Sequence, residues 1–82
     1  MNKKETYATS DLYLIAALLC RGHCKDDIQR EGQRVFYVFG STEELRETVR
    51  DYFDGVLMVD AKEYANYIQN VKTEIFDILR AS

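Results

Sequence analysis

The most constraining feature of this sequence is an unbroken apolar run at residues 12–20 (LYLIAALLC) in a chain of only 82 residues. Nine residues rise about 13 Å as a helix, which is far short of the ~30 Å core of a bilayer. A helix that is apolar nearly all round has to be covered by other elements. Caps at Thr9 or Ser10 and a left-handed turn at Gly22 predict this buried helix over about residues 10–21.

A second apolar stretch, at residues 35–39, lies in a predicted β-hairpin. Strands over about 25–31 and 33–39 flank a short turn that ends in Gly32, as primed hairpin turns do. Because the second strand does not alternate between polar and apolar residues, we expect both of its faces to be covered.

Two further helices are predicted after the hairpin. Ser41 and Glu44 have the spacing of a capping box and start a helix over about 42–54. Asp60 is placed to cap a last helix over about 61–80, whose apolar residues recur at spacings of three and four.

Residues 5–8 and 56–59 have the composition of two short outer strands. With them the predicted order is βαββαβα, which is a ferredoxin-like arrangement followed by a C-terminal helix that covers the opposite face of the sheet. If these strands are too short to form, the alternative is a hairpin surrounded by three helices. Either order gives a single α+β domain over residues 1–82 with a small antiparallel sheet.

Charge and cysteine content limit the class of partner and compartment. Fourteen acidic and eleven basic residues give a net charge of −3, so the domain has no long-range attraction for phosphate backbones or anionic membranes. The apolar run at 12–20 lacks the flanks of an export signal. We therefore expect a cytoplasmic protein in which both cysteines are free thiols.

Four stretches resemble a known family: TSDLYLIAALL at 9–19, RGH at 21–23, TEELR at 42–46 and VDAKEYAN at 59–66. The family is a bacterial one of short proteins classed as a domain of unknown function, many of them from mobile genetic elements. The resemblance implies a stand-alone cytoplasmic domain of bacterial origin, and it carries over no catalytic or binding residue.

Cys20, His23 and Cys24 are the one group of zinc-competent side chains that lie close in sequence. Structural zinc sites use two separated ligand pairs, and the second pair is missing here. A catalytic cysteine–histidine pair from neighbours in one turn is also poorly placed, and His23 is the single histidine. We expect no metal, no cofactor and no enzymatic activity.

A nucleic-acid-associated module is the alternative function. Arg30, Arg34 and Tyr37 lie on a hairpin whose second strand is aromatic, as in sheets that stack on RNA bases. The acidic balance of the chain opposes this hypothesis, and core packing is the expected role of these aromatic residues.

Six tyrosines favour a protein-interaction role, since tyrosine is enriched at interfaces. Tyr64 and Tyr67 lie three residues apart on the last helix, and Tyr13 lies on the apolar first helix. The leading hypothesis is an accessory or protein-interaction module of a mobile element, with a protein partner or a second copy as its ligand. An apolar tyrosine patch would distinguish it from the basic patch that the alternative requires.

Overall fold

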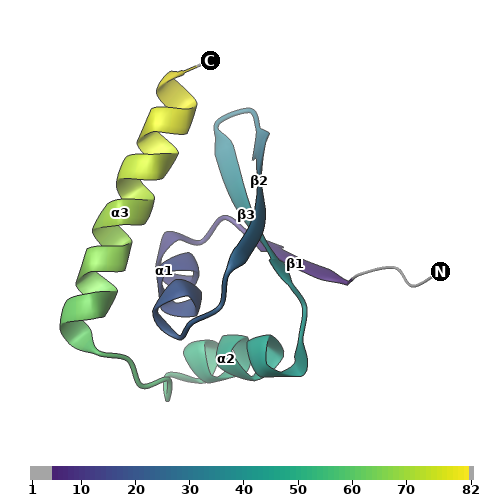
Figure 1. Ribbon diagram of the computed structural model, residues 1–82, viewed down its shortest axis with the longest axis vertical. Coiled ribbons are helices and arrows are strands. Elements are labelled where there is room, and N and C mark those ends of the chain that lie inside the picture. Colours follow the sequence, from purple (N-terminus) through teal and green to yellow (C-terminus); the bar gives the residue numbers. More distant parts are fainter. Residues whose placement is uncertain (1–4, 82) are drawn as a thin grey trace.

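Six elements follow one another in a computed structural model that describes residues 5–81. They are β1 (Thr6–Thr9), α1 (Leu12–Cys20), β2 (Lys25–Glu31), β3 (Arg34–Gly40), α2 (Glu43–Asp54) and α3 (Ala61–Arg80) (Figure 1). The predicted α+β fold, with a hairpin and three helices, is confirmed. Residues 1–4 and 82 of the predicted domain lie outside the described part of the chain.

The sheet has three antiparallel strands in the order β1-β3-β2. The aromatic strand β3 lies in the centre, where Phe39 is opposite Tyr7 on β1 and Tyr37 is opposite Ile28 on β2. The central position explains why β3 is more apolar than its neighbours, because both of its edges are paired with other strands. The N-terminal strand expected at residues 5–8 forms at nearly that position.

One face of the sheet carries the core. Val35, Tyr37 and Phe39 alternate along β3 and so point to the same side. Each helix adds side chains that are almost completely buried against them: Leu14, Ile15 and Leu18 from α1, Leu45 from α2 and Val71 from α3. All three helices therefore pack on this face, and α1 lies between α3 and the hairpin in Figure 1.

The expectation that the last helix covers the opposite face of the sheet is wrong. Val71 of α3 joins the same cluster as Tyr37, so α3 packs on the face that already holds α1. The opposite face carries Phe36 and Val38, next to the exposed residues Ala8 and Gln29. The reason is the apolar surface of α1, which needs helical neighbours on more than one side and draws α3 towards it.

Residues 56–59 do not form the second outer strand, so the ferredoxin-like order is not completed. They form a short connection from the end of α2 to the start of α3 (Figure 1). Leu57 and Val59 lie against Ala17 and Tyr64 rather than beside a strand. Because α2 ends away from the sheet edges, this short connection runs between helices and never reaches a strand partner.

Two of the predicted caps are displaced by one or two residues. Asp11, rather than Thr9 or Ser10, caps α1, and its carboxylate accepts hydrogen bonds from the N–H groups of Tyr13 and Leu14. Thr42, rather than Ser41, caps α2 by accepting from the Leu45 N–H at 3.1 Å. Asp60 caps α3 as predicted, accepting from the Glu63 N–H. The predicted range of α3 agrees with the observed one.

Candidate functional site

A shallow groove lies between the start of α1 and the C-terminal half of α3. Its volume is about 530 Å³. Four apolar residues line its floor, and Gln69, Lys72 and Thr73 border it. We call it the α1–α3 groove, with the floor Leu12, Ile75, Phe76 and Leu79. This lining offers apolar contact area rather than groups for acid–base or nucleophilic chemistry.

Phe76 is the most exposed apolar side chain of this groove, with 60% of its surface accessible. It lies off the core stripe of α3, so it is not needed to pack the helix against α1. The Arg80 guanidinium lies 5.0 Å from the centre of the Phe76 ring. Arg80 is also paired with Asp77 at 3.2 Å. Phe76 was not among the predicted site residues, although its departure from the periodicity of α3 was a usable signal.

Lys72 adds a positive charge to the edge of the α1–α3 groove. Its side chain is exposed, and no described residue forms a hydrogen bond or ion pair with its ammonium group. Arg80 lies eight residues further along the same helix. The groove therefore has an apolar floor and one basic side chain, that of Lys72, on its α3 edge.

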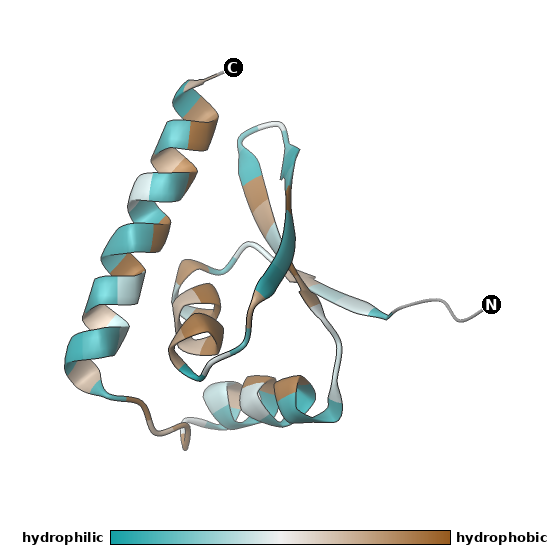
Figure 2. Cartoon of the chain, viewed as in Figure 1, coloured by the Kyte–Doolittle hydropathy of each residue, from teal (hydrophilic) through white to brown (hydrophobic). Residues whose placement is uncertain are grey.

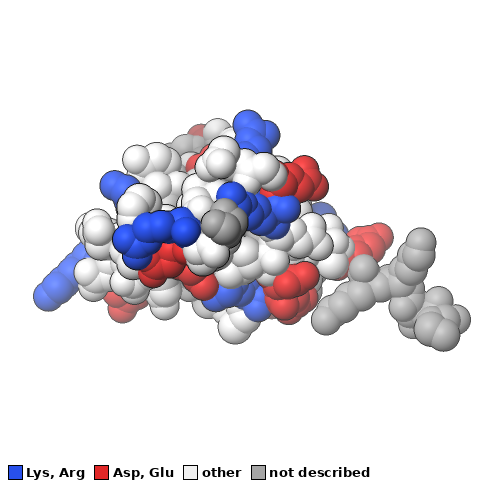
Figure 3. Space-filling model, turned by 90° about the horizontal axis from the view of Figure 1, so that it is seen from above, with Lys and Arg blue, Asp and Glu red and all other residues white. Residues whose placement is uncertain are grey.

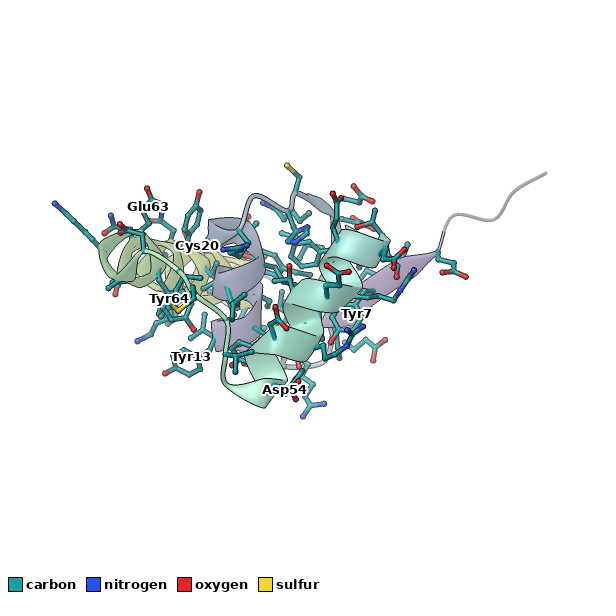
Figure 4. The ribbon with its side chains drawn as sticks, turned by 90° about the horizontal axis from the view of Figure 1, so that it is seen from below. Tyr7, Tyr13, Cys20, Asp54, Glu63 and Tyr64 are labelled. Atoms are coloured by element: carbon teal, nitrogen blue, oxygen red, sulfur yellow. The ribbon has the colours of Figure 1, made fainter. Side chains whose placement is uncertain are left out.

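The three tyrosines of the interaction hypothesis lie at different places. The Tyr64 hydroxyl donates to the Tyr13 carbonyl oxygen at 3.1 Å, which ties α3 to α1. Both residues are labelled in Figure 4. Burial, with a smaller contribution from Asp11, raises the pKa of Tyr64. Tyr67 instead lies beside the loop that follows α1, with Leu19 and Cys24. Tyr13 remains 54% exposed.

Arg30, Arg34 and Tyr37 do not form one strand face. Tyr37 is completely buried on the helix side, and its hydroxyl donates to the Glu74 carboxylate on α3. Arg30 points to the same side, where it donates to the Ile78 carbonyl oxygen at 3.3 Å. Arg34 follows the opposite alternation and is exposed. The stacking surface that the nucleic-acid alternative requires is therefore not assembled.

Charges of both signs are mixed over the surface that Figure 3 shows, and neither sign forms a continuous patch there. Figure 2 shows hydrophobic residues along α1 and in the connection between α2 and α3. Within residues 5–81, the exposed large apolar side chains are Tyr13, Phe53, Val56, Met58 and Phe76.

Cys20 ends α1, whereas His23 and Cys24 lie in the loop that follows it, and the three side chains do not come together. The His23 Nε2 atom lies 3.0 Å from the Thr48 hydroxyl. Thr48 donates its proton to the Glu44 carbonyl oxygen, so it accepts from His23 Nε2–H. Burial lowers the pKa of His23, and the nearby Arg21 charge adds to this, while Glu44 acts against it. His23 is thus a neutral link between the loop and α2.

The two cysteines are free and have different surroundings. Cys20 lies near Glu63 at the start of α3 (Figure 4), and burial together with the Glu63 charge raises the pKa of its thiol. Cys24 is exposed. Within residues 5–81, no three histidine, cysteine or carboxylate side chains come together as a metal site.

These observations define a small α+β domain with all helices on one face of a three-stranded sheet and an exposed apolar groove. The chain belongs to the family described as Domain of unknown function (DUF5659), whose model matches residues 4–77. No curated protein and no solved structure matches the chain. Among the described helices, none is long and apolar enough to cross a membrane.

Proposed function

We propose that this chain is a non-enzymatic accessory domain that binds another protein through the α1–α3 groove. The observation that carries the proposal is the exposure of Phe76 over an apolar floor of Leu12, Ile75 and Leu79. Large aromatic side chains in apolar surroundings are typical anchors of protein interfaces. A ligand that inserts apolar side chains here removes this surface from water.

The groove also favours a certain kind of ligand. Its length along α3 suits one face of an amphipathic helix, which binds grooves of this type through side chains three and four residues apart. Lys72 favours an acidic residue beside those anchors, because opposite charges at the rim of an interface promote association and specificity.

The setting of the proposed function is the bacterial cytoplasm, and the gene context is a mobile genetic element. The free cysteines fit a reducing compartment. The resemblance in the segments 9–19 and 59–66 supports the bacterial and mobile-element origin. We do not propose nucleic-acid binding, because Arg30, Arg34 and Tyr37 point to different sides of the hairpin.

The proposal is tested by affinity capture from a bacterial host with the wild type and Phe76→Asp. Because Phe76 is 60% exposed, its replacement leaves the core intact. Lys62→Asp, an exposed position on the first turn of α3, is the matched control for added negative charge. We expect a protein that the wild type and Lys62→Asp capture and that Phe76→Asp loses. Capture that Phe76→Asp leaves unchanged contradicts the proposal.

A further inference from the structure

The 56–59 segment (Val-Leu-Met-Val) is an apolar, strand-like sequence that the fold of one chain leaves unpaired. Its side-chain exposure alternates, since Val56 and Met58 are exposed whereas Leu57 and Val59 are partly buried. This period of two is the pattern of an extended chain with one side against the protein. Figure 4 shows this connection between the labelled residues Asp54 and Tyr64.

One backbone edge of the 56–59 segment is held by the domain. The Val56 N–H donates to the Asp51 carbonyl oxygen at 3.0 Å. The Met58 carbonyl oxygen accepts from the Arg21 guanidinium at 2.9 Å. In an extended chain, the N–H and C=O groups of alternate residues point to the same edge. The backbone N–H and C=O groups of the even-numbered residues therefore point to the edge that is held by the domain, although their side chains are exposed.

The other edge is free. The backbone N–H and C=O groups of Leu57 and Val59 form no hydrogen bond with any other residue of the described range 5–81. Apolar residues with unpaired backbone groups are a template for pairing with another strand. An extended backbone is the partner whose N–H and C=O groups match this free edge.

A second copy of the chain meets this requirement in full. We infer that two copies pair antiparallel through the 56–59 segment, about a two-fold axis at Met58. In this register Leu57 lies opposite Val59 of the second copy, as a hydrogen-bonded pair. The four free groups of each chain are then satisfied by the same four groups of the other. The two Met58 side chains lie next to each other at the axis.

The apolar area around the segment fits a weak dimer. Phe53, Val56 and Met58 are 65%, 62% and 78% exposed. Together they offer roughly 350 Å² per copy, by the usual areas of such side chains. Stable interfaces bury about 800 Å² per partner, so this pairing forms at high protein concentration. The surface is distinct from the α1–α3 groove, and the inference does not depend on the proposed function.

The first test is self-association of the untagged chain, measured by sedimentation equilibrium from about 10 µM to about 1 mM. We expect the mean mass to rise from the 9.6 kDa of one chain towards twice that value. The Leu57 and Val59 amides gain protection from hydrogen exchange over the same range. A chain that stays monomeric at about 1 mM overturns the inference, as does a dimer in which these amides stay unprotected.

The second test determines the register of the two paired 56–59 segments by disulfide cross-linking, in a chain that carries Cys24→Ser. Met58→Cys places two thiols across the axis with Cα atoms about 4.5 Å apart, a distance that a disulfide spans. Val56→Cys is the matched control, because its two copies are separated by about 13 Å along the strands. We expect Met58→Cys to form a covalent dimer under mild oxidation and Val56→Cys to form at least tenfold less. Equal cross-linking of the two variants overturns the register.

Two charge variants show whether self-association uses the 56–59 segment or the α1–α3 groove. Met58→Glu sets two carboxylates against each other and is expected to abolish self-association, and its 78% exposure leaves the fold intact. Phe76→Glu is expected to leave self-association unchanged. Self-association that survives Met58→Glu and is lost with Phe76→Glu assigns the contact to the groove and overturns the inference.

Discussion

Tyr37 packs in the core, whereas the nucleic-acid hypothesis placed it on an exposed strand face. Its ring is completely buried, and its hydroxyl reaches Glu74 on α3. Lys25 lies 3.9 Å from the same carboxylate and 5.6 Å from the centre of the Tyr37 ring. Tyr37 therefore joins the central strand to α3. Burial and the hydrogen bond to Glu74 raise its pKa above the ordinary tyrosine value.

We predict that Tyr37→Phe lowers the free energy of unfolding by about 1 kcal/mol, because one hydrogen bond to a half-exposed carboxylate is lost. A raised pKa in the folded state stabilises the protein below the unfolded tyrosine pKa, and this contribution is lost as the pH rises above about 10. Urea unfolding at pH 8 and near pH 11 measures both effects. The decline with pH should be smaller in Tyr37→Phe, and an identical decline contradicts the assignment.

His23 is expected to change stability with pH in the opposite direction to Tyr37. Its pKa is lowered by burial, so the folded state binds its proton less readily than the unfolded state. Its contribution to stability is present above the ordinary histidine pKa of about 6.5 and is lost as the pH falls through the folded value.

The chain has a single histidine, so its ring proton signal can be followed without ambiguity by NMR. We predict a titration midpoint below about 6.5. The midpoint should move further down in Thr48→Val, because the imidazolium loses the hydroxyl that accepts its Nε2–H bond and the ring then lies against an apolar side chain. A midpoint at or above the ordinary value in the wild type contradicts the position of His23.

At the scale of elements, the helices were predicted well because their signals are local. The observed ranges of α1, α2 and α3 differ from the predicted ones by at most two residues at either end. The caps were less predictable, because several polar residues precede each helix and the backbone angle selects one. Thr42 was chosen over Ser41, and Asp11 over Ser10.

The capping of α2 can be tested directly. We predict that Thr42→Ala lowers the free energy of unfolding by about 1 kcal/mol, because the Leu45 N–H loses its acceptor. Ser41→Ala is the matched control and should cost only a few tenths of that amount, since Ser41 accepts a bond only from the exposed Arg46. Chemical denaturation of both variants provides the measurement. A larger loss for Ser41→Ala would restore the predicted capping box.

At the scale of the whole molecule, α3 has two distinct surfaces. Val71 is 2% exposed within the core, whereas Phe76, five residues later, is 60% exposed at the groove. One helix therefore stabilises the domain with one side and offers an apolar surface with another. This division predicts that stability and binding respond to different substitutions.

We predict that Val71→Ala lowers the free energy of unfolding by about 2 kcal/mol, which is a large part of the stability of a small domain. Phe76→Ala is expected to change stability by less than about 0.5 kcal/mol, as exposed positions usually do. Thermal and urea unfolding of the two variants make the comparison. Comparable losses would mean that Phe76 packs in the core and that the groove is not an exposed surface.

The sequence alone determined the local elements of this protein. The run at residues 12–20 required a buried helix, glycine marked the hairpin turn, and the 3.6-residue periodicity of residues 61–80 defined the last helix. These features depend on neighbours a few residues apart. The sequence also identified the 56–59 segment as apolar and strand-like, although it could not supply a strand partner.

Only the tertiary structure decided which face of the sheet the last helix covers, where Tyr37 points and which residues remain exposed. These outcomes depend on competition between distant surfaces for the same neighbours. The apolar surface of α1 brought α3 to the face that α2 also covers, and this left Phe76 at a groove and Met58 in an open connection. The burial of α1 thus determines which residues of α3 and of the 56–59 segment remain exposed. Periodicity within a single segment carries no information about such contacts between distant segments.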